Sequence, residues 1–420
     1  MSIKVAVIGG GSTYTPELVS GLSGERDRID VSELWLVDPD AERREVVGGL
    51  AGRMLDVQKF EGRLEVTDEI DRALDGADVV LLQLRVGGQA ARLSDETVPL
   101  QCGCIVQETT GAGGFAKAIR TVPVVLEIAQ RVRELAADDA WIVDFTNPVG
   151  IVVRALLDAG HRAIGLCNVA IGFQREIARI YGVPPESVMV DQVGLNHLTW
   201  IRRVLIDGSD VMGELLQNAE RMEDQTGLPA ELIRLLGVLP SYYLRYFYEH
   251  DKVLEELHHE APRAQVVAEI EQDLLSLYRD PALVTKPAVL EKRGGAFYSE
   301  AATQLVGSLI AGTGDVQVVD VRAGDAMPGF AADDVVELPA RITTAGAEPI
   351  PQPPLAPELL GLARHVAAYE RLTVQAAVTH DVETMRKALL AHPLIGQFPL
   401  SDELVKLLAE AEQARRRALG

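Results

Sequence analysis

The sequence predicts an α/β protein whose first 170 residues form a parallel sheet with helices on both faces. Two observations predict this fold class. Short apolar, β-branched runs alternate with longer helical stretches, and a glycine-rich turn follows the first of these runs. Buried parallel strands are typically such runs, and helices form the crossovers between them. A third observation, a change of character after Asp191, indicates a second part of mixed α+β structure.

Each expected element follows from its local pattern. The strands predicted for the parallel sheet cover residues 4–8, 34–37, 79–84, 141–145 and 163–167. Helices are predicted at 16–22 and 121–135. Further along we expect an extended segment at 193–204, helical stretches from 212 to 277, a proline-rich loop at 349–357 and mainly helix from 358 to 419. We therefore expect two domains, residues 1–170 and residues 171–420.

The composition indicates a globular protein and excludes several classes. Hydrophobic residues make up 47% of the chain and charged residues 24%, and no uncharged apolar run reaches the roughly 20 residues of a membrane span. The 62 acidic and 40 basic residues give a formal charge of −22, which repels nucleic acid. Three cysteines, and no leader ahead of the first strand, predict a cytoplasmic protein without disulfides or a signal peptide.

The turn after the first strand is a candidate dinucleotide site. It consists of Gly9, Gly10, Gly11, Ser12 and Thr13. Glycines let a backbone approach a pyrophosphate at a helix N-terminus, as in a Rossmann domain, and the second strand ends at Asp38, where a carboxylate can bind the ribose hydroxyls. That carboxylate favours NAD over NADP. The third glycine of the usual pattern is replaced by Tyr14, so a purely structural turn is the alternative.

Cys167 and His197 are candidate ligands of a divalent metal. Cys167 follows a predicted strand, at the edge where such sheets bind ligands, and His197 lies in a second sheet-edge segment. Their spacing is not diagnostic, and taken singly a buried cysteine and a hydrogen-bonded structural histidine are the simpler interpretations. Asn147 follows the preceding strand and can reach the same cleft.

Four tyrosines between residues 242 and 248 offer a candidate base. Aromatic residues at helical spacing are usually core. The alternative is that one phenol is a catalytic base, which requires a neighbouring cation because its ordinary pKa is about 10.

In order and spacing, these segments resemble glycoside hydrolase family four, glycosidases that depend on NAD and a metal. The resemblance covers nearly the whole chain. It rests on GGGSTYTPEL at 9–18, RVGG at 85–88, QETTG at 107–111, GGFAKA at 113–118, TNP at 146–148, CN at 167–168, GLNH at 194–197, YLRY at 243–246 and KRGGAFYSEA at 292–301.

The resemblance implies a role for each candidate. It implies that Cys167 and His197 bind manganese or another divalent metal. It places the base on Tyr243, an acidic residue that raises the basicity of this base on Glu108, and substrate contacts on Arg92, Asn147, Asn168 and Arg263. The implied reaction oxidises the sugar transiently at C3 with NAD, removes the C2 proton through Tyr243 and eliminates the aglycone.

The residue after the metal-binding cysteine separates members of the family. Asn168 at this position implies a 6-phospho-β-glucosidase, although Ala170 replaces a proline that β-type members usually carry. The resemblance thus implies a lactate/malate dehydrogenase-like Rossmann domain at 1–170 and a substrate-binding, metal-binding and oligomerisation domain at 171–420. We expect a phosphorylated sugar as substrate and a homo-oligomer, a dimer or a tetramer. The alternatives are an NAD-dependent 2-hydroxy acid dehydrogenase of lactate/malate type and a non-catalytic NAD-binding sensor.

Overall fold

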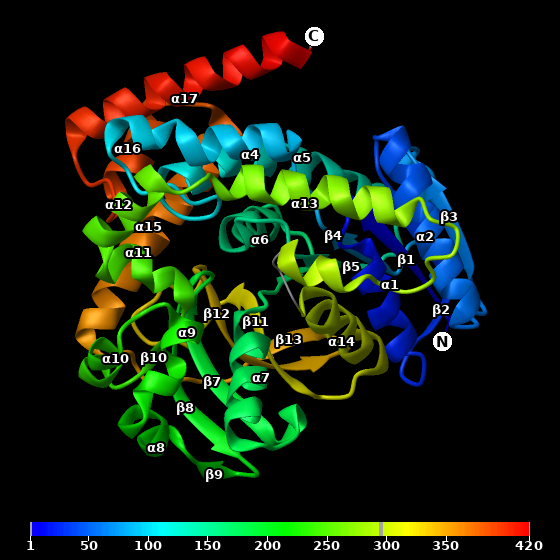
Figure 1. Ribbon diagram of the computed structural model, residues 1–420, viewed down its shortest axis with the longest axis horizontal. Coiled ribbons are helices and arrows are strands. Elements are labelled where there is room, and N and C mark those ends of the chain that lie inside the picture. Colours follow the sequence, from blue (N-terminus) through cyan, green and yellow to red (C-terminus); the bar gives the residue numbers. More distant parts are fainter. Residues whose placement is uncertain (1, 294–296, 420) are drawn as a thin grey trace.

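One sheet runs through the whole molecule. The computed structural model describes residues 2–293 and 297–419. Within them, strands pair in the order β10-β8-β7-β12-β11-β6-β5-β4-β1-β2-β3, with β9 paired to β8 and β13 to β12. Figure 1 shows the blue N-terminal strands at one end of this sheet and the green hairpin of β7 and β8 at the other. The N-terminal and C-terminal parts of the chain therefore share one backbone hydrogen-bonding network.

The N-terminal half of the sheet is the predicted parallel one. Its strands are β1 (Ser2–Ile8), β2 (Asp30–Val37), β3 (Arg63–Thr67), β4 (Val79–Leu82), β5 (Trp141–Asp144) and β6 (Ala163–Gly165). They lie side by side as 3-2-1-4-5-6, all parallel, which is the Rossmann order. The predicted fold class is confirmed. Strand β3 was not predicted, because this edge strand carries charged residues among few apolar ones.

Helices cover both faces of this half. Along β1, Val5 and Val7 pack in a core that includes α1 (Thr15–Gly24), α2 (Ala41–Val57) and α14 (Tyr298–Ala311). Ala6 and Ile8 pack in a second core that includes α3 (Ile70–Leu74), α5 (Gly111–Leu135) and α6 (Val149–Asp158). Since side chains alternate along a strand, this division means that the sheet is buried on both sides.

Helix α5 begins ten residues before the predicted start at 121. The missed turns contain Gly111, Gly113 and Gly114, and glycine disfavours helix, so the local pattern hides them. The structure explains two of these glycines. A Cβ at Gly113 would lie 2.5 Å from the carbonyl oxygen of Gln107, and one at Gly114 would lie 2.5 Å from the backbone of Thr109. The glycines thus let segment 107–109 pack directly on the start of α5.

The C-terminal half of the sheet is antiparallel. Its strands are β7 (Val188–Leu195), β8 (Leu198–Ile206), β9 (Ser209–Asp210), β10 (Leu239–Pro240), β11 (Val316–Arg322), β12 (Val335–Thr343) and β13 (Gly346–Pro349). The two halves join where Asp320 of β11 pairs with Gly165 of β6. The predicted single extended segment at 193–204 was wrong. It is the hairpin of β7 and β8, whose two-residue turn, Asn196 and His197, has no glycine to reveal it.

The remaining helices surround this sheet. They are α4 (Gly88–Thr97), α7 (Val169–Tyr181), α8 (Met212–Gln217), α9 (Glu223–Thr226), α10 (Ala230–Leu236), α11 (Arg245–Tyr248), α12 (His250–His259), α13 (Arg263–Tyr278), α15 (Pro357–Thr379), α16 (Val382–Ala391) and α17 (Phe398–Leu419). Helix α13 crosses the middle of the molecule, and α17 lies at its rim (Figure 1). Within the described part of the chain, no helix combines the length and apolarity needed to cross a membrane.

Candidate functional site

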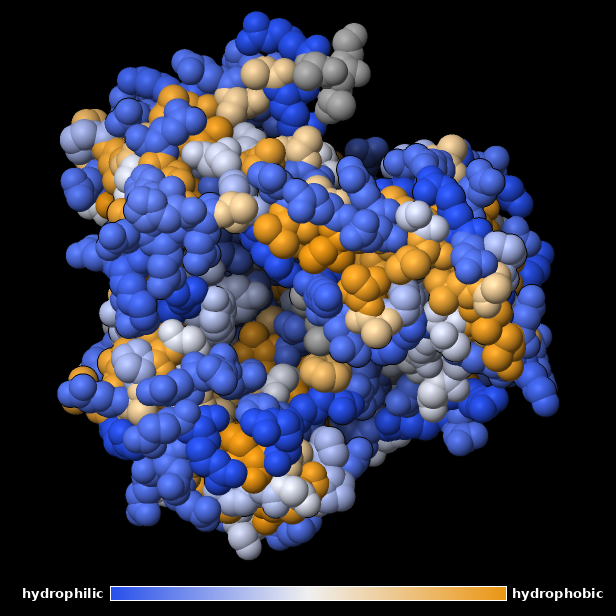
Figure 2. All heavy atoms as spheres, in the orientation of Figure 1, coloured by the Kyte–Doolittle hydropathy of each residue, from blue (hydrophilic) through white to orange (hydrophobic). Residues whose placement is uncertain are grey.

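A cleft of about 1120 Å³ opens at the carboxyl ends of the parallel strands. Residues after β1, β2, β4 and β5 line it, together with α4, segment 106–108, the Tyr-rich segment and the first half of α13. Figure 2 shows the surface hollowed between the part that carries α13 and the part that carries the antiparallel strands. Doubly wound sheets bind ligands at this edge, beside the point where the strand order reverses, which here lies between β1 and β4.

The glycine-rich turn lies at this point. The backbone N–H groups of Gly9 and Gly10 donate to the carbonyl of Val37 at 2.9 and 2.8 Å, which pulls the turn against the end of β2. Gly9 has φ +91°, and a Cβ there would lie 2.7 Å from the carbonyl oxygen of Gln83. The N–H of Gly11 donates to Asp38 Oδ2 at 3.0 Å, so the predicted ribose-binding carboxylate also holds the turn. Gly9, Ser12 and Asp38 all line the cleft.

Other side chains of this turn face inward. Thr13 is fully buried, and its hydroxyl lies 3.4 Å from Glu271 Oε1 of α13. Tyr14, which stands in place of the third glycine, is buried and also lines the cleft. The turn is therefore anchored to α13 across the cleft. The two residues in contact are 258 positions apart in the chain, so local sequence patterns cannot predict this contact.

Cys167 and His197 come from different parts of the sheet, but both act on the same phenol. Cys167 follows β6, and after burial it is the main electrostatic influence that raises the pKa of Tyr243. The His197 ring stacks on the Tyr243 ring, with centroids 3.7 Å apart and planes at 12°. Both side chains are buried, and Tyr298 donates a hydrogen bond to Cys167 Sγ at 3.6 Å. Both predicted ligands therefore lie in the surroundings of the predicted base.

The donors of this pair fit a divalent metal. Burial lowers the pKa of His197 to about 3, which keeps its ring neutral and able to offer a lone pair. His197 Nδ1 lies 2.7 Å from Thr109 Oγ1, while Nε2 is buried and has no hydrogen-bond partner among the described residues. Burial, helped by the negative charge of Glu337, raises the pKa of the Cys167 thiol well above its usual range. Within residues 2–293 and 297–419, no three His, Cys, Asp or Glu side chains form a metal cluster. A metal held here would therefore have two protein ligands and open positions for substrate oxygens.

Tyr243 follows the short strand β10 in a 3₁₀ turn, Tyr242–Leu244, and lines the cleft. Burial raises the pKa of its phenol well above the usual value, and the charges of Cys167 and Glu108 raise it further, whereas Arg92 lowers it. The phenol needs added positive charge nearby to lose its proton at neutral pH. A metal on His197 would supply that charge next to the ring.

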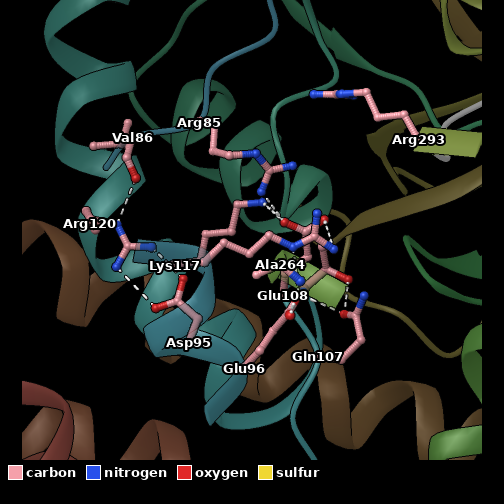
Figure 3. Close-up of polar contacts among 12 residues, drawn as sticks. Arg85, Val86, Asp95, Glu96, Gln107, Glu108, Lys117, Arg120, Ala264 and Arg293 are labelled. Carbon is pink, nitrogen blue, oxygen red and sulfur yellow. Dashed lines mark hydrogen bonds and ion pairs between the residues drawn. The ribbon is translucent and has the colours of Figure 1, made fainter. Parts of the chain in front are cut away.

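Glu108 is the centre of a buried ion-pair cluster (Figure 3). Arg85 and Lys117 bind Glu108 Oε2, the lysine at 2.9 Å, and Arg92 Nη2 lies 3.4 Å from Oε1. Burial alone would raise the pKa of Glu108, but these three cations lower it well below its ordinary value. Burial also lowers the pKa of Lys117 to about 8, although Glu108 opposes this shift. Arg85 and Lys117 were missed as site residues, although both lie in the quoted segments 85–88 and 113–118.

Glu96 connects this cluster to α13. One of its carboxylate oxygens accepts from Arg92 Nε at 2.6 Å, and the other accepts from the backbone N–H of Ala264, also at 2.6 Å. A carboxylate at a helix N-terminus stabilises the unpaired N–H groups there. This contact positions Arg263, the first residue of α13, at the cleft, where its Nη2 donates to the carbonyls of Lys292 and Arg293.

Glu271, two turns further along α13 than Arg263, was also missed as a site residue. It accepts from Arg293 Nη2 at 2.8 Å and from Arg43 Nη2 at 3.0 Å. Burial opposes its ionisation, but Arg293 and Arg43 lower its pKa to about 2. Residues 294–296 of the quoted segment 292–301 lie outside the described part of the chain.

The two asparagines lie where predicted. Asn147 follows β5 and lines the cleft, and its Oδ1 is buried with no hydrogen-bond partner among the described residues. Asn168 is the N-cap of α7 and also lines the cleft, with its Oδ1 3.8 Å from Cys167 Sγ. Every side chain singled out in the sequence is therefore at or beside one cleft, although their roles stay predictions.

Comparison with known proteins decides the family. The profile of the Family 4 glycosyl hydrolase matches residues 4–183, and that of the Family 4 glycosyl hydrolase C-terminal domain matches residues 192–395. This chain belongs to family 4 of the glycosyl hydrolases. The family 4 resemblance of the sequence is therefore confirmed.

Relatives and solved structures agree with this membership. The chain is 39% identical to a probable 6-phospho-beta-glucosidase of Bacillus subtilis, over 98% of this chain and 97% of that one. A 6-phospho-beta-glucosidase of Thermotoga maritima, solved with manganese, NAD+ and glucose-6-phosphate, has a TM-score of 0.93 at 33% identity, over 98% of this chain and 99% of that one. A malate dehydrogenase of Cryptosporidium parvum shares the fold, with a TM-score of 0.58 at 15% identity over 90% of this chain and 100% of that one.

Proposed function

We propose that this family 4 enzyme hydrolyses 6-phospho-β-glucosides and needs NAD and a divalent metal, Mn²⁺ or a similar ion. The observation that carries the proposal is the stack of Tyr243 on His197, whose Nε2 has no partner among the described residues, at a cleft that begins at a dinucleotide turn. A base, a metal ligand and a cofactor site together fit proton removal next to a transiently oxidised carbon. The 6-phospho-beta-glucosidases among the relatives support the choice of substrate.

Each group has residues suited to hold it. Gly9 to Thr13 and Asp38 would hold NAD, and Cys167 and His197 would hold the metal. When bound, NAD supplies a hydride acceptor and the metal a Lewis acid.

The chain's own residues would do the rest. Tyr243 accepts the proton at C2 of the sugar, and its ring is kept in place by His197. The charge of Glu108 raises the basicity of this phenol, while Arg92, close enough to lower its pKa, opposes it.

An anionic sugar has to find local positive charge on a chain with a formal charge of −22. Arg92 and Arg263 line the cleft, and Asn147 and Asn168 add neutral polar groups from the ends of β5 and β6. Guanidinium groups bind phosphate through charge-assisted, often bidentate hydrogen bonds. These four residues are the proposed substrate contacts.

A panel of aryl glycosides tests the proposal. Four substrates, α and β, each with and without a 6-phosphate, are assayed with NAD and Mn²⁺ added, and again after chelation and removal of NAD. We expect cleavage of the phosphorylated β-glycoside, dependence on both additions and no net NADH. Net NADH from a hydroxy acid would indicate the dehydrogenase, and NAD binding without any turnover would indicate the sensor.

Three further properties belong to this proposal. We expect a homo-oligomer, a dimer or a tetramer, which light scattering measures. The acidic surface predicts no nucleic-acid binding, which a gel-shift assay at low salt measures. A cytoplasmic location is expected, because Cys167 can bind a metal only while it is reduced.

A further inference from the structure

Thr109 makes a second contact besides the one to His197. The Thr109 hydroxyl, 2.7 Å from His197 Nδ1, donates a hydrogen bond to Gln107 Oε1. The backbone N–H of Thr109 donates to the same Oε1 at 2.6 Å. Because a backbone N–H can only donate, this atom of Gln107 is the amide oxygen, which can only accept. Gln107 thus receives two hydrogen bonds from one residue.

The number of available protons then determines which ring nitrogen of His197 is protonated. A hydroxyl has one proton, and the Thr109 proton is used on Gln107, so toward His197 the hydroxyl oxygen acts as acceptor. His197 Nδ1 must therefore carry a proton and donate it. A neutral ring with Nδ1 protonated has its lone pair on Nε2, the atom that has no partner among the described residues.

His197 has an uncommon backbone conformation. It is the second residue of a two-residue hairpin turn and has φ +63°, a conformation that favours glycine or asparagine. Among the residues that the structure describes, its ring stacks on Tyr243 and is hydrogen-bonded to Thr109. The stack fixes the plane of the ring but not which nitrogen carries the proton, so among the described residues Thr109 determines which nitrogen is protonated.

We infer that Thr109, held by Gln107, is a positioning residue that keeps His197 in the Nδ1-protonated tautomer and so presents Nε2 to a divalent metal. The inference rests on the proposed metal dependence for its purpose, but the tautomer itself is a property of the protein without metal. Groups that orient a metal-binding histidine through its second nitrogen typically contribute 10- to 100-fold to metal affinity. Glu108 lies between Gln107 and Thr109, and its charge acts on Tyr243. Residues 107–109 therefore act on both the proposed metal ligand and the proposed base.

Nitrogen-15 NMR of the metal-free full-length protein tests the tautomer directly. His197→Asn, whose new side chain tolerates the left-handed turn, identifies the His197 signals by their disappearance. We expect a protonated Nδ1 and an unprotonated Nε2 in the wild type, and a mixture or the reverse in Thr109→Val. A wild-type ring protonated at Nε2 would overturn the inference, whether or not the protein binds metal.

Metal affinity is the second readout, measured as free Mn²⁺ by electron paramagnetic resonance. Thr109→Val should weaken Mn²⁺ binding 10- to 100-fold, and Thr109→Ser, which keeps the hydroxyl, should restore it. Thr121→Val is the matched control, because Thr121 is buried in α5 with no hydrogen-bond partner for its hydroxyl among the described residues. Unchanged affinity in a folded Thr109→Val contradicts the inference. Absence of Mn²⁺ binding in the wild type contradicts the proposed function instead, and the NMR result still stands.

Discussion

The rings of His197 and Tyr243 lie face to face, with centroids 3.7 Å apart and planes at 12°. One residue sits in the turn between β7 and β8, and the other follows β10, which pairs with β8. Neighbouring strands of the antiparallel half therefore bring the proposed metal ligand against the proposed base. A metal bound to His197 would place positive charge beside the Tyr243 phenol and so lower its raised pKa, which the proposed role as a base requires.

Tyr243→Phe should keep the fold and lose the reaction. The stack on His197 survives, because only the hydroxyl is removed, and the melting temperature should change little. Turnover should fall by about 100- to 10,000-fold, the usual contribution of a general base. Product formed by the wild type in heavy water should carry deuterium at C2, as read by NMR. Tyr248→Phe, the same change at the one tyrosine of this segment that is not among the cleft-lining residues, is the control. Full activity in Tyr243→Phe would exclude this base.

Arg263→Ala should discriminate between substrates. Charge-assisted hydrogen bonds contribute about 1.5–3 kcal/mol each, so loss of a phosphate contact should reduce kcat/KM for the phosphorylated glycoside by at least about tenfold. The unphosphorylated glycoside should be affected far less. Arg279→Ala, at the exposed end of the same helix, serves as the control. An equal loss on both substrates would assign Arg263 to structure and not to the phosphate.

Glu108→Gln should remove the anion that three cations share, although Arg92 keeps its pair with Glu96. Arg85, Arg92 and Lys117 then repel one another in a buried site, and breaking a buried ion pair typically costs about 3–5 kcal/mol. The melting temperature should fall, and inorganic phosphate should raise it more in the variant than in the wild type, because an anion replaces the missing charge. Calorimetry with and without phosphate measures both effects. A variant as stable as the wild type, and equally indifferent to phosphate, would contradict this charge balance.

Glu271→Gln should change how stability depends on pH. The pKa of Glu271 in the folded protein, about 2, lies below its ordinary value, so the ionised form stabilises the fold above about pH 4.5. This contribution, on the order of 3 kcal/mol, is lost as the pH falls from about 4.5 to about 2. The stability gap between wild type and Glu271→Gln, measured by urea unfolding, should therefore shrink between pH 6 and pH 3.5. Glu269→Gln, exposed on the same helix, should show no such trend.

Local patterns in the sequence predicted five of the six parallel strands, because each of the five is a short, largely buried run beside a turn, and missed the charged edge strand β3. They missed the start of α5, where glycines needed for close packing hide a helix, and the turn at His197, where a histidine occupies a glycine-like conformation. Asp38, Asn147 and Cys167 came together because they follow strand ends, whereas Arg92 and Arg263 reach the cleft from α4 and α13. Glu271 and Arg85 escaped notice, since their importance comes from partners that only the folded chain brings near.

The seam where β6 pairs with β11 joins the two halves of the sheet and limits how the chain can be recombined. The family profiles divide the chain between residues 183 and 192, yet β6 and β11, from opposite sides of that division, are joined in one sheet at Gly165 and Asp320. A Cβ at Gly165 would lie 2.9 Å from the Asp320 side chain, so the fit across the seam is close. The halves are therefore not interchangeable modules. A chimaera that takes residues up to this division from one relative and the rest from another should assemble only when β6 and β11 come from the same parent.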